Sequence, residues 1–342
     1  MKIKFFGLFT VVILSLALTA AAQDFDSVFD RGLEQVKNKQ YVEAIESFKR
    51  ANQIRPGVPQ THFNLGVCYY NLDRYNDAVA SFREAVRLKP DYSGALIQLG
   101  NALDYAGNYS DAVIAYNKAL VYEPNNGLIY YELGVAHYGA KKYDLAEADY
   151  RKSIALKPGN ADALHNLGLT LENLNRNDDA VPYFRKVIQL NPNKLYAHRR
   201  IGDYYVRQRN FPEAIRSFQT ALRIDSTDAD ANLGMGNAYY NDGKYAESIP
   251  YYQAAAKADP SWISAHSYLG DAYRLTKRFD DAEKSYLRVV ELDPKDPDAI
   301  YGLGRVYVNQ NKIDAARKQY EKLKTIDAEK AADLAKYLPG GR

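Results

Sequence analysis

Residues 59–92 read PQTHFNLGVCYYNLDRYNDAVASFREAVRLKPDY, and one pattern in this stretch organises the whole chain. A glycine, an alanine, a large aromatic residue and a proline stand at Gly66, Ala78, Phe82 and Pro90. The pattern recurs at a step of 34 residues without insertion or deletion, most strictly at nine glycines: Gly32, Gly66, Gly100, Gly134, Gly168, Gly202, Gly236, Gly270 and Gly304. Such a period is the signature of a solenoid of helix–turn–helix units, each of which buries its apolar face against its neighbours.

Two amphipathic helices are predicted in each unit. In the quoted stretch, apolar residues recur at helical spacing over about Pro59–Leu72 and again over about Asn76–Leu88. We expect Gly66 and Ala78 to face each other where these helices meet, because small side chains let two backbones approach closely. Phe82 is expected to fill the space beside that contact. The recurring proline ends the second helix, since proline lacks an N–H and restricts the residue before it.

With these positions in register, the chain resembles the tetratricopeptide repeat family. The residues of the quoted stretch that carry the resemblance are Leu65, Gly66, Tyr69, Tyr75, Ala78, Phe82, Ala85 and Pro90. The resemblance implies an all-α fold, a right-handed superhelical solenoid of nine 34-residue helix–turn–helix repeats. Residues 23–330 hold the nine repeats, namely 25–58, 59–92, 93–126, 127–160, 161–194, 195–228, 229–262, 263–296 and 297–330. Residues 331–342 are expected to form a capping helix at Ala331–Leu338 and a tail, because such arrays need terminal caps for solubility.

The first 22 residues have the pattern of a secretory signal peptide. Lys2 and Lys4 precede an apolar run over Phe5–Leu18, and small residues follow, with Ala20 and Ala22 in the relation that signal peptidases require. We expect cleavage after Ala22 and export of the mature chain to a bacterial periplasm, or to the envelope. The alternative is a retained membrane anchor, although the apolar run is slightly short for a span of roughly 20 residues.

Charge and cysteine content narrow the function classes. Loss of Lys2 and Lys4 lowers the formal net charge from +3 to +1, so the mature chain lacks the basic excess expected of a nucleic-acid-binding protein. The single cysteine, Cys68, occupies a repeat position that holds alanine in other repeats, and we interpret it as a small buried apolar residue.

The repeats, the leader and the tail account for all 342 residues and leave no room for a catalytic domain. The five histidines include no pair at the i, i+4 spacing of a helical zinc site, and the glycines form no phosphate-binding loop. We therefore predict that the chain is not an enzyme and that it uses no cofactor and no metal.

The resemblance also implies where partners bind. In this family the first helix of each repeat lines a concave groove through its second, fifth, ninth, twelfth and thirteenth residues. In repeats one to four these positions are mainly aromatic, and they include Phe29, Phe63, Tyr70, Asn71, Ile97, Asn101, Asp104, Tyr105, Tyr131 and Tyr138. In repeats six to nine they are charged and polar, and they include Arg199, Arg207, Asn237, Tyr240, Arg274 and Arg305. Tyrosine and arginine are enriched among interface anchors, so both sets are candidate protein-binding residues.

The sequence thus favours a non-enzymatic scaffold or adaptor. It would bind an extended peptide or a partner helix in its concave groove, within a cell-envelope assembly. The alternative is a carbohydrate-binding or enzyme-recruiting accessory in polysaccharide or envelope biogenesis, because tyrosine-rich grooves can stack sugar rings. Neither hypothesis involves nucleic acid or an integral membrane span after signal cleavage, and both leave the oligomeric state open.

Overall fold

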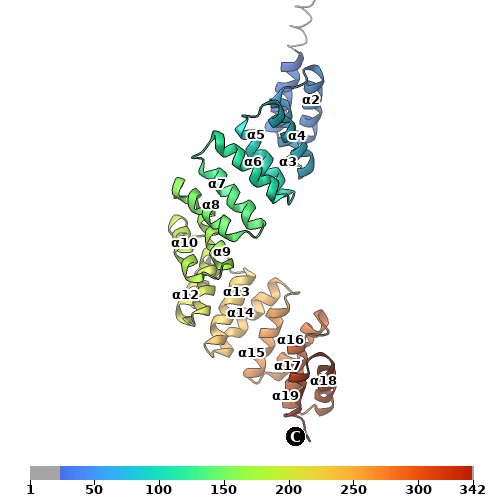
Figure 1. Cartoon of the computed structure of the whole chain (residues 1–342). Helices are drawn as coiled ribbons and strands as arrows, with labels where there is room; N and C mark the ends of the chain where they lie inside the picture. The colour runs from blue at the N-terminus through green and yellow to red at the C-terminus, as the bar shows by residue number, and fades with distance from the viewer. Residues whose placement is uncertain (1–23, 341–342) are drawn as a thin grey trace, which may run out of the picture. The chain divides into compact units, whose positions relative to one another are not determined.

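The computed structural model describes residues 24–340 (Figure 1). The predicted signal peptide of residues 1–22 lies outside the described residues, as do residue 23 and residues 341–342. The described chain divides into two compact units, residues 24–176 and residues 177–340. The boundary falls between the two helices of the fifth repeat.

Both units are built from helices alone, and no residue between 24 and 340 forms a strand. The first unit comprises a helix over residues 24–37, α2 (Tyr41–Ile54), α3 (Pro59–Asn71), α4 (Tyr75–Leu88), α5 (Ser93–Tyr105), α6 (Tyr109–Tyr122), α7 (Gly127–Gly139), α8 (Tyr143–Leu156) and α9 (Ala161–Asn173). The second comprises α10 (Asn177–Leu190), α11 (Leu195–Arg207), α12 (Phe211–Ile224), α13 (Ala229–Asn241), α14 (Tyr245–Ala258), α15 (Ile263–Leu275), α16 (Phe279–Leu292), α17 (Pro297–Asn309), α18 (Ile313–Ile326) and α19 (Ala328–Ala335).

Helices of two kinds alternate along each unit. The first helix of a repeat, here called its A helix, packs against the second, the B helix, and the B helix packs against the next A helix. Neighbouring A helices also touch, as α5 and α7 do in the first unit and α15 and α17 in the second (Figure 1). This arrangement confirms the all-α repeat solenoid that the 34-residue period predicts.

The recurring glycine makes room for the recurring aromatic ring. A Cβ atom added at Gly66 would lie 2.6 Å from Cε1 of Phe82, and its three nearest neighbours would all be atoms of that ring. Gly134 and Tyr150 repeat the contact, again at 2.6 Å. The structure therefore differs from the expectation that the glycine faces the alanine. Ala78 is fully buried, but the ring lies directly on the glycine, because only a residue without a side chain leaves space for it.

The turn between the A and B helices is made by one residue with a positive φ angle. In the second repeat Asp73 has φ 56°, and the Arg74 N–H donates to the Tyr69 carbonyl at 2.9 Å, as in a left-handed helix C-cap. The nine turn residues recur at the same step of 34 residues: Lys39, Asp73, Gly107, Lys141, Asn175, Arg209, Gly243, Lys277 and Asn311. Only two of them are glycines, so composition gives little sign of this turn.

A short helix closes the last repeat. α19 begins at Ala328, three residues before the expected Ala331, because the Asp327 side chain caps it by accepting the Lys330 N–H at 3.0 Å. Leu334 is fully buried. One of its methyl groups lies nearest to the position that a Cβ of Gly304 would take, where other repeats place the aromatic ring of their own B helix. The final helix therefore replaces the ring that packs on the glycine elsewhere.

Candidate functional site

Three tyrosine rings gather in the first unit, two on A helices and one at the start of the B helix α4. The Tyr70 ring on α3 lies 5.5 Å from the Tyr105 ring on α5, edge to face. Tyr75, at the start of α4, lies 5.6 Å from Tyr70 and stacks on Tyr105 at 5.2 Å. Tyr105 keeps 63% of its surface exposed, so this group, the tyrosine cluster, opens to solvent. The predicted groove residues include Tyr70 and Tyr105 but omit Tyr75, which occupies a packing position of the repeat.

Two carboxylates lie beside the tyrosine cluster. Burial raises the pKa of Glu132 on α7 to about 7, and the negative charge of Asp104 on α5 adds to the shift. Burial also raises the pKa of Asp104, and its Oδ1 atom is shielded from solvent without a hydrogen-bond partner. Glu132 is absent from the predicted groove residues. The sequence offers one sign of it. Glu132 is the only carboxylate in the helix GLIYYELGVAHYG, whose other side chains are uncharged except for one histidine.

Two further tyrosines of the predicted groove link A helices. The Tyr131 hydroxyl on α7 accepts a long hydrogen bond of 3.4 Å from the Asn166 amide on α9. The Tyr138 hydroxyl accepts one of 3.0 Å from Asn173, the last residue of α9. Both rings are half-buried. These tyrosines therefore tie α7 to α9 along the same face that carries the tyrosine cluster.

The apolar residues of the predicted first groove support the core. The Phe29 ring lies 5.4 Å from the buried Phe48 ring, and the Phe63 ring lies 5.7 Å from the buried Phe82 ring. Ile97 packs against the core cluster of repeats two to four. Each of these three side chains is half-buried, so it offers one edge to solvent and uses the other for packing.

The asparagines of this set bond to the protein itself. The Asn101 side-chain oxygen accepts a hydrogen bond of 2.7 Å from the buried Tyr116 hydroxyl. The Asn71 amide donates to the Val67 carbonyl within its own helix at 2.8 Å. Asn101 therefore satisfies a tyrosine that would otherwise bury an unpaired hydroxyl, which costs free energy.

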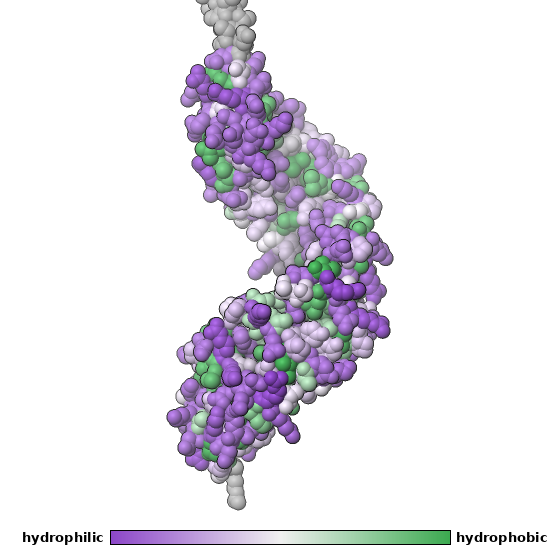
Figure 2. Space-filling model, turned by 180° about the vertical axis from the view of Figure 1, so that it is seen from behind, coloured by the Kyte–Doolittle hydropathy of each residue, from purple (hydrophilic) through white to green (hydrophobic). Residues whose placement is uncertain are grey.

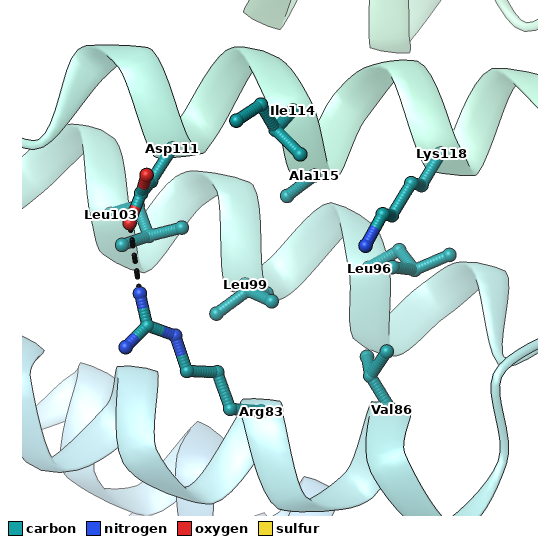
Figure 3. Close-up of a pocket in the computed structure, with 9 residues that line it drawn as sticks. All are labelled: Arg83, Val86, Leu96, Leu99, Leu103, Asp111, Ile114, Ala115 and Lys118. Carbon is teal, nitrogen blue, oxygen red and sulfur yellow. Dashed lines mark hydrogen bonds and ion pairs between the residues drawn. The ribbon is translucent and has the colours of Figure 1, made fainter.

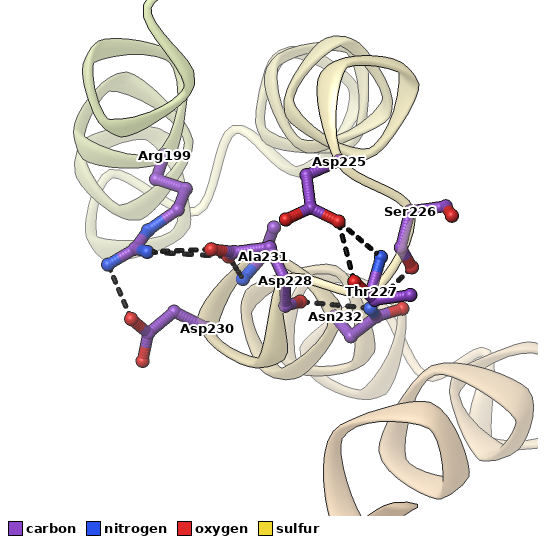
Figure 4. Close-up of polar contacts among 8 residues, drawn as sticks. All are labelled: Arg199, Asp225, Ser226, Thr227, Asp228, Asp230, Ala231 and Asn232. Carbon is purple, nitrogen blue, oxygen red and sulfur yellow. Dashed lines mark hydrogen bonds and ion pairs between the residues drawn. The ribbon is translucent and has the colours of Figure 1, made fainter. Parts of the chain in front are cut away.

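In the second unit, Arg199 of the predicted groove forms a bridge between A helices. Its guanidinium on α11 lies 3.1 Å from the Asp228 carboxylate and 2.5 Å from that of Asp230 (Figure 4). Asp228 also caps α13 by accepting the Ala231 N–H at 2.7 Å. The positive charge of Arg199 is thus compensated by two carboxylates at the start of the next A helix.

Arg274 has a compensating partner as well. Its guanidinium on α15 lies 3.2 Å from the Asp271 carboxylate, which also accepts a hydrogen bond of 2.7 Å from the buried Tyr286 hydroxyl. Asn237 on α13 has the equivalent role in the preceding repeat, where its side-chain oxygen accepts from Tyr252 at 2.9 Å.

Two remaining residues of the second set lie at the ends of A helices. The Tyr240 ring on α13 contacts the Tyr245 ring edge to face at 5.1 Å, and burial raises the Tyr240 pKa to about 12. Arg207 is the last residue of α11 and is exposed.

A hollow of about 380 Å³ lies between the A helices α15 and α17. Its lining includes Ser264, Ser267, Tyr268, Asp271, Arg274 and Tyr301. With Asp296 and Asp298 also in the lining, hydroxyl groups, three carboxylates and a guanidinium thus lie beside two tyrosine rings, an assortment that can both donate and accept hydrogen bonds.

The C-terminal segment covers the last residue of the predicted groove. The Arg305 guanidinium lies 3.5 Å from the centre of the Tyr337 ring and donates to the Tyr301 hydroxyl at 2.8 Å. That hydroxyl donates in turn to Asp333 of α19 at 2.5 Å. The C-terminal segment therefore covers part of the surface of the ninth A helix, α17.

A second hollow, of about 260 Å³, lies away from the predicted groove, between α4, α5 and α6 (Figure 3). Its floor includes Leu96, Leu99 and Leu103, and an ion pair of 2.9 Å between Arg83 and Asp111 crosses its rim. The sequence gives no sign of this hollow, because the expected positions all lie on A helices.

On the face shown in Figure 2 the surface is mostly hydrophilic, with small separate hydrophobic areas.

Residues 24–340 contain no helix that is long and apolar enough to cross a membrane. Over the same residues, no group of three or more His, Cys, Asp or Glu side chains is arranged to hold a metal ion. Cys68 is fully buried, as its repeat position predicts, and burial raises its pKa to about 11.

Sequence profiles described as tetratricopeptide repeat match residues 59–92, residues 97–297 in overlapping segments, and residues 273–336. The chain belongs to the tetratricopeptide repeat family. Tetratricopeptide repeats are typical of non-catalytic protein-interaction scaffolds. A comparison with curated proteins gives no significant match.

The chain is similar to several solved structures. The C-terminal part of a tetratricopeptide repeat-containing protein from Cytophaga hutchinsonii is 20% identical, with a TM-score of 0.59, and the match covers 70% of this chain and 98% of that one. MamA from Desulfovibrio magneticus RS-1 is 20% identical, with a TM-score of 0.48, over 50% of this chain and 96% of that one. YrrB, described as a TPR protein with an unusual peptide-binding site, is 22% identical, with a TM-score of 0.48, over 55% of this chain and 96% of that one. The Cytophaga structure shows the fold.

Proposed function

We propose that this protein is a non-enzymatic adaptor that binds an extended peptide or a partner helix along its A helices. The observation that carries the proposal is the tyrosine cluster, in which Tyr105 remains 63% exposed beside two half-buried aromatic rings. A group of contacting tyrosines that opens to solvent offers a rigid apolar surface with hydroxyl groups at its edge, which is typical of interface anchors.

A binding experiment with a matched control tests the proposal. The chain from residue 23 onward is used to select peptides from a random displayed library, and the affinity of each selected peptide is then measured. Tyr105→Ala should weaken binding at least about tenfold, as expected for an interface anchor. Tyr122→Ala removes a tyrosine of similar exposure (48%) from the B helix α6 and should leave the affinity unchanged. Selected peptides that bind both variants like the parent chain would overturn the assignment of this face.

We further propose that the protein works outside the cytoplasm, in an envelope assembly. The support is the signal-peptide pattern of residues 1–22 in the sequence. Mass spectrometry of the protein from fractionated native cells should find a periplasmic or envelope-bound chain that begins at Gln23. A chain that retains Met1 in the envelope fraction would instead indicate a membrane anchor, and one that retains Met1 in the cytoplasm would overturn export.

A further inference from the structure

Half-buried charges on the A helices are compensated in the second unit. Arg199 lies within 3.1 Å of two carboxylates, and Asp271 lies 3.2 Å from the Arg274 guanidinium. Pairing of this kind is expected, because a charge removed from water is costly unless an opposite charge or hydrogen bonds stabilise it.

The corresponding face of the first unit holds two carboxylates without such a partner. No basic group contributes to the electrostatic environment of Asp104 or Glu132; burial acts on both, and the charge of Asp104 acts on Glu132. Within residues 24–340, the structure shows no hydrogen bond or ion pair to Glu132, and Asp104 Oδ1 is shielded from solvent without a partner. The site therefore holds uncompensated negative charge.

Tyrosine rings surround these carboxylates. The charge of Glu132 acts on the hydroxyls of Tyr70, Tyr116 and Tyr131, and burial and this charge together raise the pKa of each. Of these rings, Tyr70 belongs to the solvent-open cluster through its contact with Tyr105. Aromatic faces attract cations, and they also cover the methylene stems of lysine and arginine.

We infer that the partner of this face presents a lysine or arginine side chain to Asp104 and Glu132, with its stem against the tyrosine cluster. The inference rests on the proposed function and specifies the chemistry of the partner. An ammonium or guanidinium group would donate a hydrogen bond to the half-buried Glu132 carboxylate. It would also place positive charge beside Asp104, whose Oδ1 is shielded from solvent. A neutral or acidic peptide offers neither, so charge complementarity selects a basic segment.

The probe is the same random displayed library, selected on the chain from residue 23 onward at pH 8. We expect the selected peptides to be enriched in lysine or arginine at one position. Glu132→Gln, which keeps the shape of the side chain, should weaken those peptides about tenfold, equivalent to about 1.4 kcal/mol. Peptides in which norleucine replaces the enriched basic residue should also bind the parent chain about tenfold more weakly. The same replacement should change the affinity for the Glu132→Gln chain little further.

Asp144→Asn is the matched control, since it removes one negative charge from an exposed position on the B helix α8. It should bind the basic peptides like the parent chain, and circular dichroism should show both variants folded. If peptides bind through Tyr105 but show no basic preference, or bind Glu132→Gln equally well, the inference is overturned and the proposed function stands. If no selected peptide depends on Tyr105 for binding, both the proposed function and this inference are overturned.

Discussion

Replacing Glu132 by glutamine should stabilise the folded chain at alkaline pH and have little effect at acidic pH. Burial and the charge of Asp104 raise the pKa of Glu132 from the ordinary value of 4.5 to about 7. The folded chain therefore binds more protons than the unfolded chain in this interval. The contribution of this carboxyl to stability is complete below pH 4.5 and is lost as the pH rises through 7.

The size of the effect follows from the pKa. Each pKa unit corresponds to about 1.4 kcal/mol, so a difference of roughly 2.5 units sets an upper limit of about 3.5 kcal/mol. Glu132 is only half-buried, and solvent screening reduces such shifts, so we expect about 1–2 kcal/mol. The groups that surround it are Asp104 of α5 and the tyrosines of α3, α6, α7 and α8, none of which carries a positive charge.

Urea denaturation followed by circular dichroism at pH 5 and pH 8 measures the difference between Glu132→Gln and the parent chain. That difference should grow by about 1–2 kcal/mol from the lower pH to the higher, while Asp144→Asn should show no such growth. Carbon-13 NMR of the side-chain carboxyl gives the pKa directly. A Glu132 that titrates near 4.5, or a stability difference that is equal at both pH values, would refute the reasoning that an uncompensated carboxylate is buried here.

Three further predictions concern packing. Gly134→Ala places a Cβ 2.6 Å from the Tyr150 ring and should cost about 1–2 kcal/mol after the gain in helix propensity, whereas Gly159→Ala meets no atom within 4 Å; equal thermal midpoints for the two variants would contradict the glycine–ring contact. Cys68, with its raised pKa of about 11, should react with a thiol reagent at pH 8 far more slowly in the native chain than in urea, and rapid native labelling would show that the thiol is accessible. Leu334→Ala should lower stability by about 2–5 kcal/mol and speed hydrogen exchange in α17 and α18; unchanged exchange would mean that α19 does not close the last repeat.

The sequence predicts the helices well, because their apolar positions repeat at one step through the whole chain. The predicted Pro59–Leu72 and Asn76–Leu88 differ from the observed α3 and α4 by one residue at one end of each. The start of α19 was not predicted, since its cap, Asp327, lies within the last repeat and breaks no visible pattern. Helix positions thus follow from periodicity, whereas ends depend on single side-chain hydrogen bonds.

The site is less accessible to sequence reasoning. Tyr70 and Tyr105 are predictable groove residues, because the resemblance identifies the exposed positions of the A helices. The relation between Asp104 and Glu132 is not predictable in the same way. They lie on different A helices at unrelated repeat positions, and the absence of a nearby cation emerges only when every neighbouring side chain has been placed. Burial and charge compensation are properties of the packed structure.

The left-handed turns have a consequence for engineering. Seven of the nine turn residues carry side chains. The left-handed conformation costs an L-residue with a side chain about 1–2 kcal/mol. Glycine avoids this cost, although it loses more conformational entropy on folding, a smaller term. Exchanging Lys141 or Lys277 for glycine should therefore gain about 0.5–1 kcal/mol each. The turns at Lys141 and Lys277 join A helices to B helices, and neither residue belongs to the tyrosine cluster, whereas the turn residue Asp73 accepts a hydrogen bond from Tyr75 of that cluster at 2.7 Å. Exchanges at the two lysines can therefore make the protein more heat-resistant while its recognition surface keeps every side chain.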